Sequence, residues 1–130
     1  MFNHFTFISL TLASTILFQM SSMAQHQNRL VRVAKLEIDF TQLESYKTAL
    51  KEEIETSVRI EQGVLALYAV SEKVNPTHIT IFEIYVNEDA YKAHLETSHF
   101  KKYKTTTKNM IKSLELMESI PIALESKPKL

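Results

Sequence analysis

The residues best suited to acid–base chemistry lie together in the stretch Glu83–Tyr103. His94 and His99 carry imidazoles, which gain and lose a proton close to neutral pH. Glu83 follows an apolar run, where a carboxylate must be paired or protonated because its burial otherwise costs several kcal/mol. We therefore predict Glu83, His94 and His99 as candidate catalytic residues for a reaction that begins with removal of a proton from the substrate.

Each of these residues also has a structural alternative. Glu83 either tunes or orients a histidine, or it pairs with an arginine, a lysine, a tyrosine or backbone amides. His94 falls on the helix side expected to face a sheet, where it either accepts a proton from a substrate or is hydrogen-bonded to a carbonyl group or to Glu83. His99 belongs either to a pocket rim or to a helix end. His78 stands beside the Asn75-Pro76 turn, which favours a surface position.

Aromatic side chains accompany the acid–base residues. A tyrosine can stack on a flat ring and hydrogen-bond to one of its oxygens, and a phenylalanine can supply an apolar wall. The alternative is a core position with each hydroxyl at the edge of the core. The candidate substrate-binding residues are Tyr85, Tyr91, Tyr103, Phe82 and Phe100.

Metal, cofactor and nucleic-acid sites are not expected. His94 and His99 are five positions apart, whereas a spacing of i, i+4 lets two imidazoles on one helix share a metal, and the chain has no cysteine. Its single glycine excludes a glycine-rich nucleotide loop. The 15 basic and 15 acidic residues leave no net charge to attract nucleic acid. The lysines of the run 101–108 are expected on a solvated helix face.

Residues 1–24 are predicted to be a secretory signal peptide. The first 28 residues contain no Lys, Arg, Asp or Glu, and an apolar core runs from Phe5 to Phe18. This core is shorter than the roughly 20 residues that span a membrane, and Ser22-Met23-Ala24 resembles a cleavage site. We expect an exported, periplasmic protein with no stable membrane insertion after cleavage. Residues 25–130 then form a single domain whose core covers 30–123.

Periodicity divides the mature chain into strands and helices in the order β-α-β-β-α-β, which is the ferredoxin-like arrangement of the α+β class. In chain order, the predicted elements are a strand over 30–39, a helix over 41–61, strands over 64–71 and 78–85, a helix from 87 that is interrupted at 97–98 and resumes to about 111, and a strand over 113–120.

Local signals set the ends of the first predicted helix. Thr41 and Glu44 have the spacing of a capping box, and Gly63 can end the helix in the left-handed conformation. The buried stripe of this helix is predicted to consist of apolar residues three or four positions apart: Leu43, Tyr46, Leu50, Ile54 and Val58. The strand that follows, over 64–71, is apolar enough to be buried on both faces.

The predicted sheet has helices on one face only. Its other face is rich in apolar residues, and such a patch is too large to stay exposed on a monomer. Two sheets related by a two-fold axis would cover each other. We therefore predict a homodimer.

The stretch Glu83–Tyr103 also carries a family resemblance. Its pattern E-x-Y at a strand end, followed by A-Y-x-x-H and H-F-x-x-Y, resembles the antibiotic biosynthesis monooxygenase (ABM) family over roughly residues 31–123. The resemblance implies a dimeric α/β barrel with a ligand pocket between sheet and helices. It also implies oxygenation of a substrate by dioxygen without flavin or metal. The chain has no tryptophan, unlike the polyketide-oxidising and haem-degrading relatives, which favours a quinol or another dihydroxyaromatic substrate.

In the activity implied by this resemblance, His94 or His99 removes a phenolic proton, Glu83 orients or tunes the base, and tyrosines position the ring. The electron-rich anion then passes an electron to dioxygen. Two alternatives stay open. One is a non-catalytic dimer that binds a small aromatic or hydrophobic ligand, and the other is a haem-handling protein with His94 or His99 as the axial ligand.

Overall fold

A computed structural model describes residues 28–128, so the predicted signal peptide at residues 1–24 lies outside the described part of the chain. No helix within residues 28–128 is long and apolar enough to cross a membrane. The elements are β1 (Leu30–Ile38), the short 3-10 helix η1 (Phe40–Gln42), α2 (Leu43–Ile60), β2 (Val64–Ser71), β3 (His78–Tyr85), α3 (Glu88–Leu95), α4 (Ser98–Thr107) and β4 (Ile111–Ser119).

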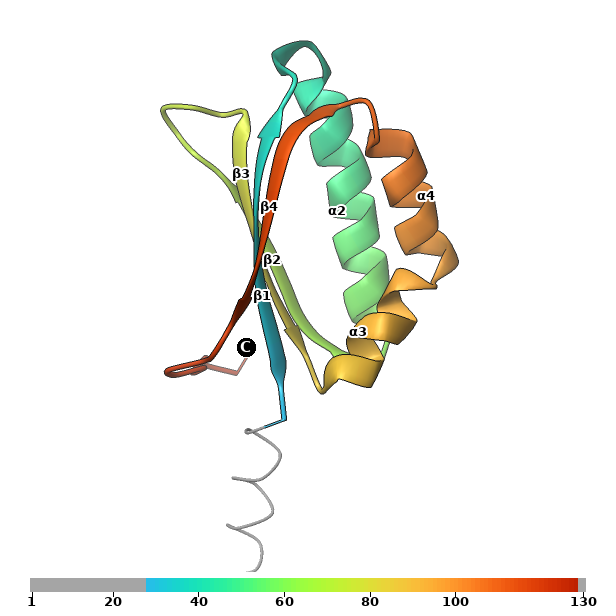
Figure 1. Ribbon diagram of the computed structural model, residues 1–130, viewed down its shortest axis with the longest axis vertical. Helices are drawn as coiled ribbons and strands as arrows, with labels where there is room; N and C mark the ends of the chain where they lie inside the picture. Colours follow the sequence, from blue (N-terminus) through green and yellow to red (C-terminus); the bar gives the residue numbers. More distant parts are fainter. Residues whose placement is uncertain (1–27, 129–130) are drawn as a thin grey trace, which may run out of the picture.

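The strands form one antiparallel sheet in the order β2-β3-β1-β4. Helices α2, α3 and α4 all cover the same face of this sheet (Figure 1). The arrangement confirms the predicted ferredoxin-like α+β fold. The sheet remains open within one chain, so it does not close into a barrel by itself.

Strand alternation gives the sheet a covered face and an open face. On the covered face, Ala34, Leu36 and Ile38 of β1 are buried in a cluster with residues of α2. On the open face, Val33 pairs with Phe82, which in turn pairs with Tyr68. Because β2 lies at the sheet edge and the helices cover only one face, Tyr68 is 61% exposed. The expectation that β2 is buried on both faces is therefore wrong for the single chain.

The start of α2 differs from the predicted capping box. Asp39, not Thr41, supplies the cap: its carboxylate accepts hydrogen bonds from the backbone N–H and the hydroxyl of Thr41. Glu44 accepts a hydrogen bond from Lys47. The physical reason is the one-turn helix η1, which begins directly after Asp39 and moves the first free N–H groups toward its carboxylate.

The buried stripe of α2 changes from apolar to polar along the helix. Tyr46 and Leu50 are buried as predicted, but the stripe continues through Glu53 and Ser57, which are 6% and 0% exposed. Val58, predicted to be buried, is 44% exposed. A step of three residues from Leu50, followed by a step of four, keeps this polar pair on the face toward α3 and α4.

The predicted interruption at Thr97-Ser98 separates α3 from α4. The Thr97 side chain caps α4 by accepting a hydrogen bond from the backbone N–H of Phe100. The second helix ends at Thr107, earlier than predicted, and β4 begins at Ile111. This break allows α4 to run beside α2 (Figure 1). It also places His94 and His99 on two different helices.

Gly63 follows α2 for a steric reason. Its backbone does not adopt a positive φ, so the predicted left-handed conformation is wrong. A Cβ atom at this position would lie 2.5 Å from the Cβ of Ala90 in α3. The absence of a side chain lets the turn before β2 approach α3 closely.

Candidate active site

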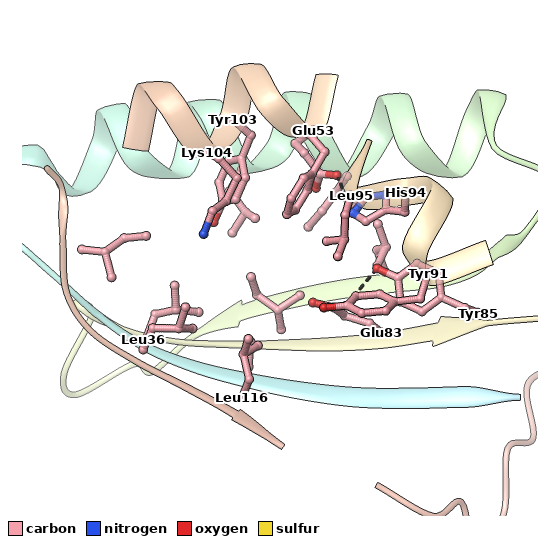
Figure 2. A pocket seen from close by; sticks show the side chains of 18 residues that line it. Leu36, Glu53, Glu83, Tyr85, Tyr91, His94, Leu95, Tyr103, Lys104 and Leu116 are labelled. Carbon is pink, nitrogen blue, oxygen red and sulfur yellow. Dashed lines mark hydrogen bonds and ion pairs between the residues drawn. The ribbon is translucent and has the colours of Figure 1, made fainter. Parts of the chain in front are cut away.

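A cavity lies between the helices and the covered face of the sheet (Figure 2). It offers about 80 Å³ of space to water. Since one water needs roughly 10–15 Å³ by this measure, the space holds several waters or a small single-ring molecule. Leu36 and Leu116 lie on its sheet side, and Tyr103 and Lys104 on its helix side (Figure 2).

A chain of hydrogen bonds and close polar contacts begins at the cavity wall. Glu53 lines the cavity, and its Oε1 lies 3.5 Å from Nε2 of His94. Nδ1 of the same imidazole lies 3.0 Å from Oε2 of Glu61, and Nε2 of His99 lies 2.7 Å from that same oxygen. Ser57 donates a hydrogen bond of 2.7 Å to Glu53 Oε1. The structure thus brings together the two predicted histidines and two carboxylates that the sequence analysis did not select.

The missed carboxylates had a sequence signal. Glu53 and Ser57 continue the three-four spacing that starts at Tyr46 and Leu50, and Glu61 comes four residues after Ser57. The apolar residues Ile54 and Val58 fit a similar spacing and were chosen because a buried stripe is usually apolar. Polar residues at the buried spacing of an amphipathic helix, here Glu53 and Ser57 in α2, indicate a buried polar site.

The pKa values of Glu53 and Glu61 are shifted in opposite directions. Burial raises the pKa of Glu53, and this effect exceeds the stabilisation of its anion by the Ser57 hydroxyl, His94 and His99. Burial also acts on Glu61, but hydrogen bonds from His99 and His94 outweigh it and lower the pKa of Glu61. Glu53 is therefore suited to accept a proton, and Glu61 is suited to remain an anion between the two imidazoles.

Glu83 lies on the cavity wall but does not orient a histidine. Its partner is Tyr85, whose hydroxyl donates a hydrogen bond of 2.9 Å to Glu83 Oε2 (Figure 2). Burial raises the pKa of Glu83, and Tyr85, His94 and Arg32 act against this shift. The role expected from sequence, a carboxylate that positions an imidazole, belongs to Glu61 and Glu53. Glu83 forms no hydrogen bond or ion pair with a histidine among residues 28–128.

Arg32 supplies positive charge next to Glu83. The two residues are paired in register on neighbouring strands β1 and β3. The guanidinium carbon of Arg32 lies 4.4 Å from the centre of the Tyr91 ring, which is the geometry of a cation–π contact. Its Nε is buried without a hydrogen-bond partner within residues 28–128. This contact fixes Tyr91 at one end of the cavity.

Four of the five predicted aromatic residues line the cavity: Tyr85, Tyr91, Phe100 and Tyr103. The Phe100 ring packs against His94 with 4.7 Å between ring centres. The hydroxyl of Tyr103 shares a buried hydrogen bond of 2.8 Å with that of Tyr46. Phe82 does not line the cavity, because neighbouring residues of a strand point to opposite faces and Glu83 occupies the covered one. Phe82 instead lies on the open face, between Val33 and Tyr68.

His94 and His99 lie close together, although their five-residue spacing predicted that they would not. On one continuous helix a five-residue spacing would direct the imidazoles apart, but Thr97-Ser98 starts a new helix and the ring centres lie 6.3 Å apart. One donor atom each from Glu53, His94 and His99 lies within 4.8 Å of the others. That distance would admit an ion. However, both nitrogens of His94 already face carboxylates, and His99 is bonded to Glu61. We interpret the cluster as a hydrogen-bonded network.

The remaining histidine and the lysines lie outside this site. His78 is exposed and lies 3.4 Å from Glu72, as expected for a surface residue. Lys101 and Lys102 are exposed and paired with Glu96 and Glu52 at 2.8 and 2.6 Å. These pairs agree with a solvated helix face.

The fold and the cavity define a small α+β protein with a cavity between an open antiparallel sheet and its helices. The family model of the antibiotic biosynthesis monooxygenases matches residues 29–106, more than half of the sequence, and the chain belongs to this ABM family. The match ends before β4, so it is shorter than the region 31–123 that carried the resemblance. No curated protein matches the chain significantly.

Solved structures agree with this assignment. A proposed antibiotic biosynthesis monooxygenase from Bacteroides thetaiotaomicron is 51% identical, and the similarity covers 80% of this chain and 99% of that one, with a TM-score of 0.76. A proposed monooxygenase from Lactobacillus acidophilus is 30% identical over 71% of this chain and 44% of that one, with a TM-score of 0.70. A protein from Nitrosomonas europaea shares the fold at 20% identity, with a TM-score of 0.68 over 72% of this chain and 99% of that one.

Proposed function

We propose that this protein is an exported monooxygenase that oxidises a quinol or another dihydroxyaromatic compound without a cofactor. The observation that carries the proposal is the cavity itself. Its volume suits a single aromatic ring, its sheet side is mostly apolar apart from Glu83 and Tyr85, and the carboxylate of Glu53 and the imidazole of His94 reach its wall together. Membership of the ABM family supports an oxygenase-type reaction.

The reaction requires a base and a dry pocket. Removal of a phenolic proton leaves an electron-rich anion that can pass an electron to dioxygen. For a simple quinol, one oxygen atom of dioxygen enters the ring and the other leaves as water, so the products are a hydroxyquinone and water. The substrate supplies all four electrons, and the protein needs only to bind it, take its proton and exclude water.

The cavity divides the candidate residues into roles. His94 contacts the cavity wall, whereas His99 does not line the cavity and acts from behind it. Tyr85 and Tyr91 lie at one end, where they can hold the flat ring, and Lys104 is placed to stabilise a developing oxyanion.

Assembly and export belong to the same proposal. Two open sheet faces, each carrying Val33, Phe82 and Tyr68, would form a homodimer by covering one another. Such a dimer would also cover the half-exposed outer side of β2. Cleavage after residue 24 and release into the periplasm would give the mature protein, and mass spectrometry of a periplasmic fraction would test this by finding Gln25 at the N-terminus.

A non-catalytic binder of small aromatic compounds is the second candidate. The contacts of His94 favour this second candidate. An imidazole held on both sides by carboxylates can form a rigid part of a binding pocket without taking part in a reaction. The same contacts argue against His94 as a haem ligand, since neither of its nitrogens is free to ligate iron, and Nε2 of His99 is bonded to Glu61. Oxygen uptake with a panel of quinols separates the enzyme from the binder: an enzyme consumes oxygen in proportion to product, and a binder changes only the absorbance or fluorescence of its ligand.

A further inference from the structure

We propose that Glu53 accepts the phenolic proton and that His94, Glu61 and His99 conduct it from the cavity to solvent. This inference rests on the proposed function and adds to it a proton acceptor and an exit path. The path uses residues of α2, α3 and α4 together with Glu61, the residue that follows α2.

The entrance is the carboxylate of Glu53. It is 6% exposed and lines the main cavity, and it is held by the Ser57 hydroxyl on one oxygen. A carboxylate buried in this way costs free energy as an anion. Uptake of a proton during the reaction would neutralise Glu53 and remove this cost.

The middle of the path is an imidazole between two carboxylates. His94 presents Nε2 to Glu53 at 3.5 Å and Nδ1 to Glu61 at 3.0 Å. A proton that arrives on Nε2 can therefore leave from Nδ1 without rotation of the ring. The 3.5 Å contact with Glu53 must shorten to hydrogen-bond length for the first transfer, whereas the transfer from Nδ1 follows an existing contact of 3.0 Å.

The exit is His99. Its Nε2 shares the Glu61 oxygen with His94, at 2.7 Å, and its side chain is 14% exposed. His99 also borders a second hollow of about 50 Å³, large enough for water, which Glu53 and Lys102 line as well. Water in this hollow can remove the proton from His99.

The proton count balances along the path. The phenolic O–H bond breaks and its proton joins Glu53, which passes it to Nε2 of His94. The proton on Nδ1 of His94 moves to Glu61, Glu61 passes a proton to Nε2 of His99, and His99 releases the proton on its Nδ1 to water. One proton enters and one leaves, so the two carboxylates and two imidazoles recover their starting charge. Each imidazole recovers its starting tautomer when its ring turns over.

Other titratable groups surround Glu53 without joining the path. The hydroxyls of Tyr46 and Tyr103 bond to each other, and Glu83 is bonded to Tyr85. Burial raises the pKa of each of these three tyrosines, so they stay protonated. Glu83 adds a carboxylate farther along the cavity, where Arg32 faces it on the sheet.

The test uses 4-nitrophenol, a single-ring phenol whose anion absorbs visible light and which does not consume oxygen. At a pH where the free probe is mostly neutral, the wild-type protein is expected to bind it as the phenolate and to release a proton to a pH indicator in weak buffer. Glu53→Gln keeps a hydrogen-bond acceptor for Ser57 but cannot take up a proton, so its bound probe is expected to stay neutral.

The exit is tested by the rate of proton release. His99→Ala and the more conservative His99→Gln are expected to reach the same final phenolate absorbance but to release the proton about 100-fold more slowly, the low end of what a positioned acid–base group contributes. Added imidazole should restore the rate in His99→Ala. His78→Ala, which removes an exposed histidine, is the matched control and should behave like wild type.

Each outcome decides between the claims. A probe that binds to the wild-type protein but stays neutral overturns the path and leaves the oxygenase proposal standing. Equal release rates in wild type and both His99 variants overturn the exit. A protein that binds no phenol at all overturns the proposed function together with the path. Circular dichroism and thermal unfolding of each variant show whether it is folded.

Discussion

Nε2 of His99 lies 2.7 Å from Oε2 of Glu61, although the two residues are 38 positions apart in the chain. The contact exists because α4 starts anew at Ser98 and runs beside α2. His94, from the preceding helix, reaches the same oxygen at 3.0 Å. One carboxylate thus joins three helices at the point where the cavity ends.

Glu61→Gln is expected to reduce the free energy of unfolding at neutral pH by about 1.5–3 kcal/mol, the contribution of hydrogen bonds to a charged group. The variant keeps the size of the side chain but removes the anion that both imidazoles face. Chemical denaturation followed by circular dichroism measures the difference.

The pH dependence of this difference follows from the lowered pKa of Glu61. A carboxyl group whose pKa is lower in the folded state stabilises the fold above its unfolded value, here 4.5, and loses that contribution as the pH falls through the folded value. The stabilities of wild type and Glu61→Gln should therefore begin to converge as the pH falls below 4.5 and become equal only below the lowered pKa of the folded state. A difference that stays constant down to the acid transition would show that Glu61 acts by shape and not by charge.

Gly63→Ala is expected to destabilise the protein by about 1–3 kcal/mol, the usual effect of overpacking. The new Cβ would lie 2.5 Å from the Cβ of Ala90, so the turn before β2 or the start of α3 must move. Thermal unfolding measures the loss. The double variant Gly63→Ala/Ala90→Gly removes the clash and should recover part of the stability, whereas additive losses would contradict the steric explanation.

Ala34→Leu is expected to abolish binding of single-ring phenols while the protein stays folded. Ala34 lies on the cavity wall in β1, and a larger side chain there would occupy much of the 80 Å³. Isothermal titration with 4-nitrophenol measures the binding. Val74→Leu, at an exposed position in the β2–β3 connection, is the control and should bind normally. Unchanged binding by Ala34→Leu would place the ligand elsewhere.

Tyr68→Lys is expected to convert the proposed homodimer into a folded monomer. Tyr68 is 61% exposed in the single chain, so its replacement should not disturb the core, but two buried lysines facing each other across a two-fold axis would separate the sheets. Sedimentation equilibrium measures the mass. Val74→Lys adds the same charge outside the sheet and should leave the dimer intact. If wild type is itself a monomer, the open face has another role.

The strands and helices could be predicted because their signals are local. The strands predicted over 64–71 and 78–85 match the bounds of β2 and β3, and the interruption at Thr97-Ser98 marks the boundary between α3 and α4. The start of α2 was missed because η1 intervenes, and the conformation of Gly63 was missed because its neighbour Ala90 comes from a later helix. Such tertiary contacts have no signal in a short window.

The site was predicted in part for the same reason. His94 and His99 stand out by residue type, and three tyrosines follow from the same stretch, whereas Phe82 was selected although its alternation with Glu83 places it on the other face. The carboxylates that face the histidines were sought near them in sequence, at Glu83. They lie instead at Glu53 in α2 and at Glu61 directly after it, and α2 meets α3 and α4 only in the folded protein.

The central claim is that the cavity supports oxygenation of a dihydroxyaromatic compound without a cofactor. The most direct measurement is oxygen consumption by the purified, chelator-treated protein with a panel of quinols, with product mass measured after incubation in ¹⁸O₂. We predict uptake of one dioxygen per substrate and one labelled oxygen atom in the product, with activity lost in Glu53→Gln and kept in His78→Ala. Quinols that bind in the cavity but cause no oxygen uptake above the uncatalysed rate would contradict the claim and leave a binding protein.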